Sequence, residues 1–499
     1  MKMWLTTMAA GWVFLAGVGH AAAAPVTVTV DATRTGADIA PDFSGLSFET
    51  SLLLPSDNGV RYFRPDNQPL ITLFHTLGIK HLRIGGNTGD RDWKRSPELA
   101  DLDSLFAFAR EAKVKVIYCL RLHGGDPQAA VQTAKYIMGH YAPLVDCFSI
   151  GQEPSAYPVE QVDARPAAER MGAAHEKYPY AAYAAGWKTF ADAISAAVPG
   201  VRFSGPGVHN NADWARKFMG DFGRSNHVAL ITEHLYAGGA GGKVPTPEIG
   251  RDRMLGEDFI RAYQKLYDGF VPLAVSHGLP YRLEEVNNYF NGGATNVSNT
   301  YAAALWGLDF MWWWAEHGAA GLNFHTGDRV AAGNALRPSR YTAFYSTTDG
   351  FEVRPLGYGL KAFDLGGHGR LLAATVANPD QLNLGIHAVR AETGGLRLTL
   401  INKEHGPAGR SATVTIHLVP PGNAPAQVMI LTAPAGDLAA TSGVTLGGAE
   451  IKNDGRWQGA WTPLAGDGNG VFTLELSAAT AAIVSWPAGK IEDRSLKVH

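Results

Sequence analysis

The chain has 499 residues, which is more than one small domain needs and enough for roughly two to four domains of typical size. Hydrophobic residues make up 46% and charged residues 18% of it, which supplies a large core and excludes a mainly disordered protein. The net charge is −3 at pH 7 and there is no long basic run, so nucleic acid is not expected as a partner. The same observation argues against a long basic groove for a polyanionic sugar chain.

The first 24 residues have the layout of a signal peptide. Lys2 precedes an apolar run over residues 8–18, and the alanines at 21–24 before Pro25 are the small residues of a cleavage site. The alternative, a membrane anchor, is disfavoured because the apolar run is short for a span. We therefore expect residues 1–24 to be a signal peptide and the mature protein to be exported, periplasmic or secreted, with no membrane partner.

A strand with alternating β-branched residues follows within residues 25–40. Beyond it, eight apolar strand-like runs alternate with helical stretches, and each run ends at or just before a polar residue. This alternation predicts a (β/α)8 barrel over residues 41–355 with its site at the carboxyl ends of the strands. The alternative, a doubly wound open sheet, lacks a glycine-rich phosphate loop after its first strand. The eight predicted strands are 42–48, 81–85, 114–121, 145–150, 201–204, 229–236, 281–285 and 321–325, and clear helical stretches are 102–113, 127–141, 183–197, 258–277 and 300–317.

From about residue 358 the pattern changes to short alternating runs separated by Gly, Pro and Asn. These runs predict an all-β sandwich domain over residues 356–490, which the strand at 25–40 joins. The tail at 491–499 is polar and is expected to be disordered. The predicted sandwich strands are 396–401, 412–418, 427–431, 472–476 and 481–486.

The chain has two cysteines, Cys119 and Cys147, which excludes a disulfide scaffold. Both lie in apolar strand-like runs, so two buried thiols are expected, although a bridge between neighbouring strands stays open. No cluster of His, Cys and Asp has the spacing of metal ligands. We therefore expect no metal and no other cofactor.

Two of the apolar runs end in carboxylates: F-S-I-G-Q-E-P reaches Glu153, and Y-R-L-E-E reaches Glu284 and Glu285. Two carboxylates at strand ends are what glycoside hydrolysis needs, one as acid/base and one as nucleophile. Pro154 ends the first strand and leaves Glu153 at the barrel mouth, where burial near a second carboxylate is expected to raise its pKa. Strand alternation sends Glu284 and Glu285 to opposite faces, and we assign catalysis to Glu285 and a supporting ion pair to Glu284.

Further polar residues lie near these carboxylates in the predicted barrel. His234 and Tyr236 share a face of the sixth strand, where a Tyr hydroxyl can hold a nucleophilic carboxylate ionised; the alternative is a buried Tyr bonded to a carbonyl. Gly292 and Gly293 can present backbone N–H groups to a sugar carboxylate, or form an ordinary flexible loop. His325 is either a sugar ligand or a core histidine.

These motifs resemble those of the clan A retaining glycoside hydrolases. The stretch R-L-E-E-V-N-N-Y-F-N-G-G at 282–293 is similar, more narrowly, to glycoside hydrolase family 79, which includes β-glucuronidases and heparanases. Asp31, G-L-S at 45–47 and L-R-I-G-G-N at 82–87 resemble the N-terminal part of that family. The resemblance covers most of the mature chain and is greatest to bacterial exo-acting β-glucuronidases.

The resemblance implies that Glu153 is the acid/base and Glu285 the nucleophile. It also implies that the family's backbone contacts to the uronate carboxylate fall at Gly292 and Gly293, and that a tyrosine, for which Tyr341 is the candidate, contacts the same carboxylate. The clan usually has Asn before the acid/base, bonded to the sugar 2-hydroxyl, whereas this chain has Gln152, an amide with a longer reach. The residues expected to bind substrate are Gln152, Tyr236, His234, Asn87, Glu49, Gly292, Gly293, His325 and Tyr341.

We therefore expect an exported, monomeric, retaining exo-β-glucuronidase that hydrolyses terminal β-linked glucuronic acid from glycosides or from polysaccharide or proteoglycan side chains. One alternative is an endo-acting, heparanase-like enzyme, which would need an open cleft and basic subsites. A second is an arabinofuranosidase- or xylosidase-type enzyme, whose sugar carries no carboxylate. A third is a non-catalytic carbohydrate-binding protein on a barrel scaffold, which the intact carboxylate pair disfavours.

Overall fold

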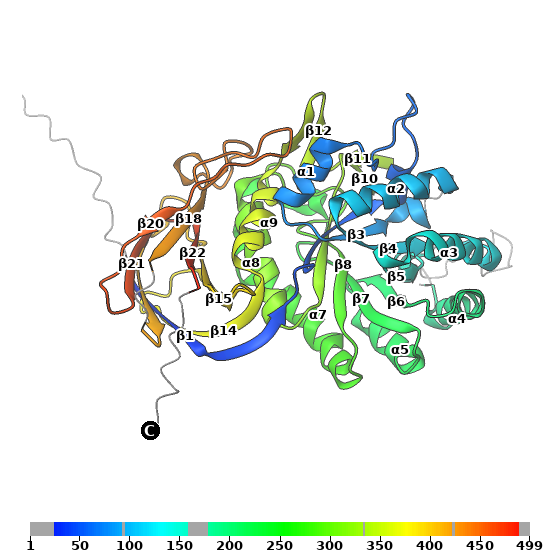
Figure 1. Cartoon of the computed structure of the whole chain (residues 1–499), viewed down its shortest axis with the longest axis horizontal. Coiled ribbons are helices and arrows are strands. Elements are labelled where there is room, and N and C mark those ends of the chain that lie inside the picture. Colours follow the sequence, from blue (N-terminus) through cyan, green and yellow to red (C-terminus); the bar gives the residue numbers. More distant parts are fainter. Residues whose placement is uncertain (1–23, 92–94, 158–177, 333–334, 422–424, 489–499) are drawn as a thin grey trace, which may run out of the picture.

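The computed structural model describes residues 24–91, 95–157, 178–332, 335–421 and 425–488. The predicted signal peptide, except for Ala24, and the predicted tail at 491–499 lie outside the described residues and stay predictions. The described chain forms a barrel ringed by helices, with a large β-sheet on one side of it (Figure 1). Within the described residues, no helix combines the length and the apolarity that a bilayer span requires.

Eight parallel strands close the barrel, in the order in which they occur along the chain. The first strand pairs with both the second and the eighth, which removes every free edge. All eight predicted strands are confirmed, and most of their positions are buried on both faces, as a barrel covered by helices requires. The strands are β2 (Ser44–Glu49), β3 (His81–Gly85), β4 (Lys115–Leu120), β5 (Val145–Ile150), β6 (Phe203–His209), β7 (Val228–Tyr236), β8 (Tyr281–Asn287) and β9 (Gly321–His325).

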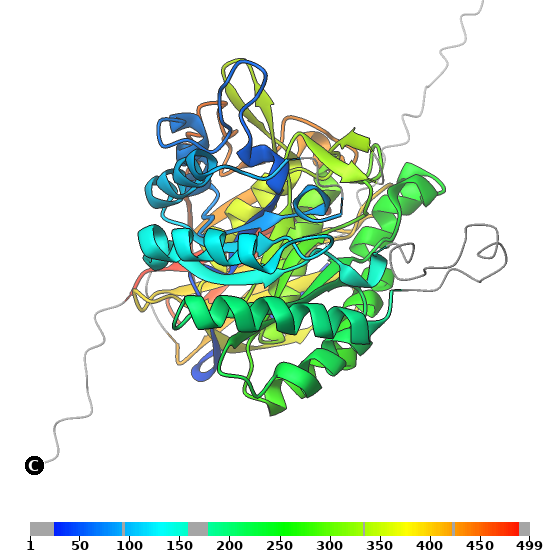
Figure 2. The same cartoon turned by 90° about the vertical axis from the view of Figure 1, so that its right-hand side faces the viewer.

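The helices begin where the sequence supplies local signals. Asp126 caps α3 by accepting a hydrogen bond from the Gln128 N–H at 3.0 Å, and Pro127 occupies the first helical position. Figure 2 shows the blue, cyan and green helices of the first half of the barrel side by side on its outer surface. The helices are α1 (Gln68–Thr76), α2 (Leu99–Ala112), α3 (Pro127–Tyr141), α4 (Tyr180–Ala197), α5 (Ala212–Phe222), α6 (Pro247–Leu255), α7 (Glu257–Ser276), α8 (Tyr301–Glu316) and α9 (Pro355–Gly366).

The second part of the chain is one curled sheet that packs as a sandwich. Its strand order is β19-β18-β22-β16-β15-β14-β1-β17-β21, with β20 paired to β18. The strand predicted at 25–40 joins this sheet as β1, antiparallel to β14 and parallel to β17. The strands are β1 (Ala24–Ile39), β14 (Gly369–Ala377), β15 (Leu384–Arg390), β16 (Leu396–Asn402), β17 (Ala412–Val419), β18 (Ala426–Thr432), β19 (Thr445–Leu446), β20 (Thr462–Leu464), β21 (Val471–Leu476) and β22 (Thr480–Trp486).

The sheet and the barrel share a hydrophobic core. On β22, Ile483 belongs to the core that includes the barrel, whereas its neighbour Val484 belongs to a core inside the sheet. Helices α8 and α9 lie between the two parts, and α8 is buried on almost every side (Figure 1). The Lys403 ammonium also reaches Asp309 of α8 at 2.8 Å. This large contact fixes the sheet against the side of the barrel, away from the mouth.

The boundary between the two parts differs from the prediction. Helix α9 runs from Pro355 to Gly366, so the sheet begins at Gly369, whereas the pattern placed its start at residue 356. The glycines of L-G-Y-G-L disfavour a helix locally. In the structure they permit close contact, because a Cβ at Gly359 would collide with the Ala304 carbonyl of α8. Packing against neighbouring elements therefore stabilises this helix, although its local sequence disfavours a helix.

The two cysteines are free and buried, as expected by default. Cys147 of β5 lies opposite Ile117 of β4, while Cys119 lies opposite Ser149, so the thiols sit at different positions along the strand pair. Burial raises the pKa of the Cys119 thiol to about 12. Both side chains therefore act as apolar core groups.

Two short hairpins follow the last barrel strand. Strands β10 (Arg329–Ala332) and β11 (Ala335–Pro338) form the first, and β12 (Phe344–Thr347) and β13 (Gly350–Val353) form the second. The first hairpin reaches the barrel mouth, because Ala331 donates its N–H to Glu49 at the end of β2.

Candidate active site

A cavity of about 240 Å³ opens at the carboxyl ends of the barrel strands. This is the face on which barrel enzymes carry their sites. Its lining is mostly polar and comes from seven of the eight strands or the loops that follow them. The lining residues are Glu49, Asn87, Arg91, Glu153, His209, Tyr236, Glu285, Phe290, Asn291, His325, Ala331 and Tyr341.

Glu285 lies on β8 and is 5% exposed. Its Oε1 accepts a hydrogen bond from the Tyr236 hydroxyl at 2.9 Å. Its Oε2 accepts from Arg83 Nη1 at 2.9 Å and from Gln152 Nε2 at 3.0 Å. Burial favours the neutral form, but the charges of His325, His234 and Arg83 and the Tyr236 hydroxyl outweigh it and hold the pKa of Glu285 well below its usual range. The side chain is therefore an ionised, oriented carboxylate, as a nucleophile must be.

Arg83 is a part of the site that the sequence analysis did not assign. It lies on β3 with no exposed surface, and besides Glu285 it contacts the Gln152 carbonyl oxygen and the Ser47 hydroxyl. Gly85 makes room for it, since a Cβ there would overlap the guanidinium group. The sequence did contain a signal for this role, since Arg83 lies inside the apolar run L-R-I-G. A buried arginine requires a buried partner of opposite charge.

Glu153 follows β5 in a left-handed backbone conformation, with φ of 43°. Its Oε1 lies 3.1 Å from His234 Nδ1, and its Oε2 accepts from Arg91 Nη2 at 2.8 Å. Arg91 also contacts the Asn87 side-chain oxygen and is another lining residue that the sequence analysis missed. The available sequence signal was its position, six residues after the end of a predicted barrel strand.

The expected rise in the pKa of Glu153 is wrong for this state of the protein. Burial does favour the neutral carboxyl, but the hydrogen bond from His234 and the positive charge of Arg91 outweigh burial and lower the pKa. Without substrate, Glu153 is thus a carboxylate between two cations. The sequence pattern had shown the burial but neither cation.

The two carboxylates are close together. One oxygen of Glu153 and one of Glu285 lie within 4.8 Å of each other, and a ring nitrogen of His234 lies within the same distance of both. These atom types also bind metal ions. However, Arg83 and Arg91 already neutralise the two carboxylates, so we assign no metal to them.

The other predicted residues fall into two groups. Glu49, Asn87 and His325 line the cavity. Glu49 is fixed there by the backbone N–H and hydroxyl of Thr88, at 2.9 and 2.7 Å. Gln152 does not line the cavity, because its amide is used between Arg83 and Glu285.

Of the predicted uronate ligands, one lines the cavity and two do not. Tyr341 lines it, with its ring centre 6.0 Å from that of Tyr236. Gly292 and Gly293 both have positive φ, near 84° and 87°, and are not among the lining residues, whereas Asn291 is. Their contact with a sugar carboxylate stays a prediction.

Comparisons with known proteins agree with this geometry. A model of the glycosyl hydrolase family 79 C-terminal beta domain matches residues 386–483. A β-glucuronidase of Aspergillus niger is 29% identical over 124 residues, which cover 24% of this chain and 23% of that protein. Part of the chain therefore resembles glycoside hydrolase family 79, most clearly in its C-terminal β domain. The match spans less than a quarter of the length of the Aspergillus relative.

Solved structures similar to this chain cover almost all of it. A 4-O-α-L-rhamnosyl-β-D-glucuronidase from Fusarium oxysporum 12S has a TM-score of 0.67 and 19% identity, over 92% of this chain and 100% of that one. A monomeric β-xylosidase from Caulobacter crescentus CB15 has a TM-score of 0.59 and 14% identity, over 93% and 100%. At these identities the likeness shows the fold, a barrel with an attached β-sandwich, and confirms the predicted fold class.

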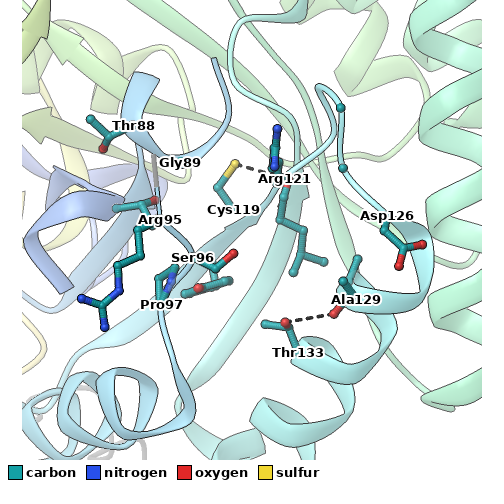
Figure 3. Close-up of a pocket in the computed structure, with 16 residues that line it drawn as sticks. Thr88, Gly89, Arg95, Ser96, Pro97, Cys119, Arg121, Asp126, Ala129 and Thr133 are labelled. Atoms are coloured by element: carbon teal, nitrogen blue, oxygen red, sulfur yellow. Dashed lines mark hydrogen bonds between the residues drawn. The ribbon is translucent and has the colours of Figure 1, made fainter. Parts of the chain in front are cut away.

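A second cavity of about 210 Å³ lies between the loop after β3 and the start of α3 (Figure 3). Cys119 and Arg121 lie at its centre in this view, and Thr133 of α3 donates to the Ala129 carbonyl at its edge. Arg95, on its rim, is paired with Glu98 at 2.8 Å. Neither Glu153 nor Glu285 lines this cavity, so the first cavity is the candidate active site.

Proposed function

We propose that this protein is a retaining exo-β-glucuronidase that releases terminal β-linked glucuronic acid by double displacement. The observation that carries the proposal is the carboxylate pair Glu153 and Glu285, with oxygens within 4.8 Å at the barrel mouth. Retaining glycosidases hold their carboxyl groups roughly 5–5.5 Å apart, whereas inverting enzymes need roughly 6.5–9.5 Å for a water molecule. The observed distance supports the retaining arrangement.

The geometry gives each carboxylate a role. Glu285 attacks the anomeric carbon while the Glu153 carboxyl gives a proton to the glycosidic oxygen, and the bond to the leaving group breaks with its electron pair on that oxygen. Glu153 then takes a proton from water as the water attacks the glycosyl–Glu285 ester. Glu153 is then protonated again and Glu285 is again a free carboxylate. Tyr236 and Arg83 keep Glu285 ionised and oriented for the first step.

Charge and size support a terminal uronic acid as the substrate. Arg91 and His325 line the cavity, and the charges of Glu285 and Glu49 raise the pKa of His325 against the effect of burial. Two cations beside polar groups suit a sugar that carries a carboxylate. The volume of about 240 Å³ is below the roughly 300–1,000 Å³ of sites for drug-sized ligands, which favours one sugar unit over a chain.

The experiment compares release of 4-nitrophenol from the β-glucuronide, the β-glucoside and the α-arabinofuranoside. We expect a strong preference for the glucuronide and its loss in Glu285→Gln. Glu248→Gln, at an exposed position on α6, is the matched control and should keep full activity. Preference for the arabinofuranoside, or normal activity of Glu285→Gln, would overturn the proposal.

Two further measurements test the finer parts of the proposal. Proton NMR of the first-formed sugar should show the β-anomer, and release of only single uronic acid units from a polymer should show exo action. Release of long fragments would instead favour the endo-acting, heparanase-like alternative. We also propose export of a monomer, based on the signal-peptide layout of residues 1–24. Cell fractionation and light scattering test these two points.

A further inference from the structure

Behind the acid/base lies a buried charge pair that the catalytic scheme does not use. His234 of β7 and Glu284 of β8 both have no exposed surface. His234 Nδ1 faces Glu153 at 3.1 Å, while its Nε2 lies 3.5 Å from Glu284 Oε1 on the opposite side of the ring. The imidazole thus stands between two carboxylates, Glu153 at the cavity and Glu284 in the buried interior near Gly207 of β6.

Glu284 is ionised, and His234 is the cation nearest to it. Neither of its carboxylate oxygens has a well-formed hydrogen bond among the described residues, and His234 is the one described cation within 4.0 Å of them. A distance of 3.5 Å is long for a hydrogen bond, so the attraction is mainly between charges. His234, the charge of Arg83 and the Thr232 hydroxyl together outweigh burial and lower the pKa of Glu284.

The remaining charged groups around His234 act in the same direction or are neutral. Glu285 lies 3.9 Å from Nδ1, and its charge, with those of Glu153 and Glu284, raises the pKa of His234 to about 9 despite burial. Arg91 contacts Glu153, while Arg83 contacts Glu285 and its charge also favours the ionised form of Glu284. Burial lowers the pKa of His209, which leaves that ring neutral.

Glu233, next to His234 on β7, is the exception among the nearby carboxyl groups. It points to the other face of the strand, where its Oε2 accepts one backbone N–H, from Asn211 at 3.3 Å. Burial raises its pKa well above the usual range and so favours its neutral form. Glu233 and Glu284 are therefore two equally buried carboxyl groups of opposite charge state.

A general acid must hold a proton, yet Glu153 is ionised between its two cations in the free protein. The histidine in contact with it is His234, whose Nδ1 lies 3.1 Å from Glu153 Oε1. We propose that His234 stores the proton that Glu153 delivers, and that Glu284 is a positioning residue that keeps His234 charged. The inference rests on the proposed function, because it concerns the acid step of that reaction.

The proton balance closes over one cycle. The proton on His234 Nδ1 moves to the Glu153 carboxylate, which leaves a neutral imidazole and a carboxylic acid. The acid gives this proton to the glycosidic oxygen as the bond to the sugar breaks. In the second step Glu153 takes a proton from the attacking water and returns it to His234. Glu284 keeps its charge throughout and offsets the imidazolium at the start and end.

The first test compares pH profiles of kcat/KM for the wild type, Glu284→Gln and Glu233→Gln. The alkaline limb reports loss of the stored proton. Removing the charge of Glu284 should move this limb to lower pH by about one unit or more, while activity below the limb is kept. Glu233→Gln removes no charge and should leave the limb in place. An unshifted limb in Glu284→Gln, or equal shifts in both variants, would overturn the inference without affecting the proposed function.

The second test reads the charge of His234 without any turnover. Nitrogen-15 histidine spectra of the wild type, with the His234 signals assigned from their loss in His234→Gln, should show an imidazolium at pH 8. A neutral ring at pH 7 would overturn the inference. This result needs neither a folded Glu284 variant nor an active enzyme. If the wild type hydrolyses no glycoside, the proposed function fails, and the charge state of His234 still decides whether the buried pair exists as described.

Discussion

The two proposed catalytic carboxylates are held in different ways, although both lie near the ends of barrel strands. Glu285 lies within β8 and receives three hydrogen bonds, from Tyr236, Arg83 and Gln152. Glu153 has a left-handed backbone conformation just after its strand. Its carboxylate contacts two cations, the titratable His234 and the partly exposed Arg91. The nucleophile must stay ionised until it attacks, whereas the acid/base must change charge twice in each cycle. The three hydrogen bonds to Glu285 suit a carboxylate that stays ionised. The titratable neighbour of Glu153 suits a carboxyl group that gains and loses a proton.

The largest effect in this comparison is expected from Glu153→Gln with a basic leaving group. General acid assistance is worth roughly 10²–10⁴-fold. The rate should fall by about this factor for a methyl or sugar aglycone, and much less for 4-nitrophenol, which leaves with little protonation. Steady-state kinetics on both substrates check this. Equal losses on both would mean that Glu153 is not the proton donor.

Arg83→Met should have the next largest effect, because it leaves the Glu285 charge buried without its main donor. Breaking a buried ion pair costs about 3–5 kcal/mol, so kcat/KM should fall by roughly 10²-fold or more. The pKa of Glu285 is lowered in the wild type, so its active form is lost only at low pH. The variant raises this pKa, and the acid limb of kcat/KM should move to higher pH. An unmoved limb in a folded variant would contradict the assignment.

Tyr236→Phe removes one hydrogen bond to Glu285 and keeps the ring that packs beside Tyr341. Hydrogen bonds to charged groups are worth about 1.5–3 kcal/mol, which corresponds to roughly a 10- to 150-fold loss in kcat/KM. The circular dichroism spectrum and thermal unfolding should change little. A wild-type rate would show that Arg83 and Gln152 suffice to orient the nucleophile.

Arg91→Gln is expected to have the smallest effect. Its side chain is 20% exposed, so solvent screens its contact with Glu153 more than that of a buried pair. Loss of its charge should raise the pKa of Glu153 and change kcat by no more than about tenfold. The KM for a glucuronide should rise if Arg91 also attracts the sugar carboxylate. A KM ratio between glucuronide and glucoside that does not change would remove Arg91 from substrate recognition.

Much of the fold could be predicted because its signals are local. Eight apolar runs with polar ends mark eight barrel strands, and alternation marks the sheet strands at 396–401 and 481–486. Helix α9 could not be predicted in this way, because Gly357 and Gly359 disfavour a helix and are explained only by close contacts with Ala343 and with Ala304 of α8. The strands β14 and β15 also escaped notice.

The site residues also differ in whether local sequence signals could identify them. Glu153, Tyr236 and Glu285 end strands and could be found from the pattern. Arg83 and Arg91 could not be assigned, because their roles depend on partners 202 and 62 residues away in the chain. For the same reason the direction of the pKa shift of Glu153 was predicted incorrectly: burial is visible in a sequence, but the cations that overcome it are brought by other strands.

The most direct test of the central claim is trapping of the covalent intermediate. The protein would be treated with a 2-deoxy-2-fluoro-β-glucuronyl fluoride, which slows breakdown of the glycosyl-enzyme, and then digested and analysed by mass spectrometry. We predict one added uronosyl group on the peptide that contains Glu285, and none in Glu285→Gln. A label on another residue, or an active enzyme that never accumulates a label and yields the α-anomer, would contradict the account.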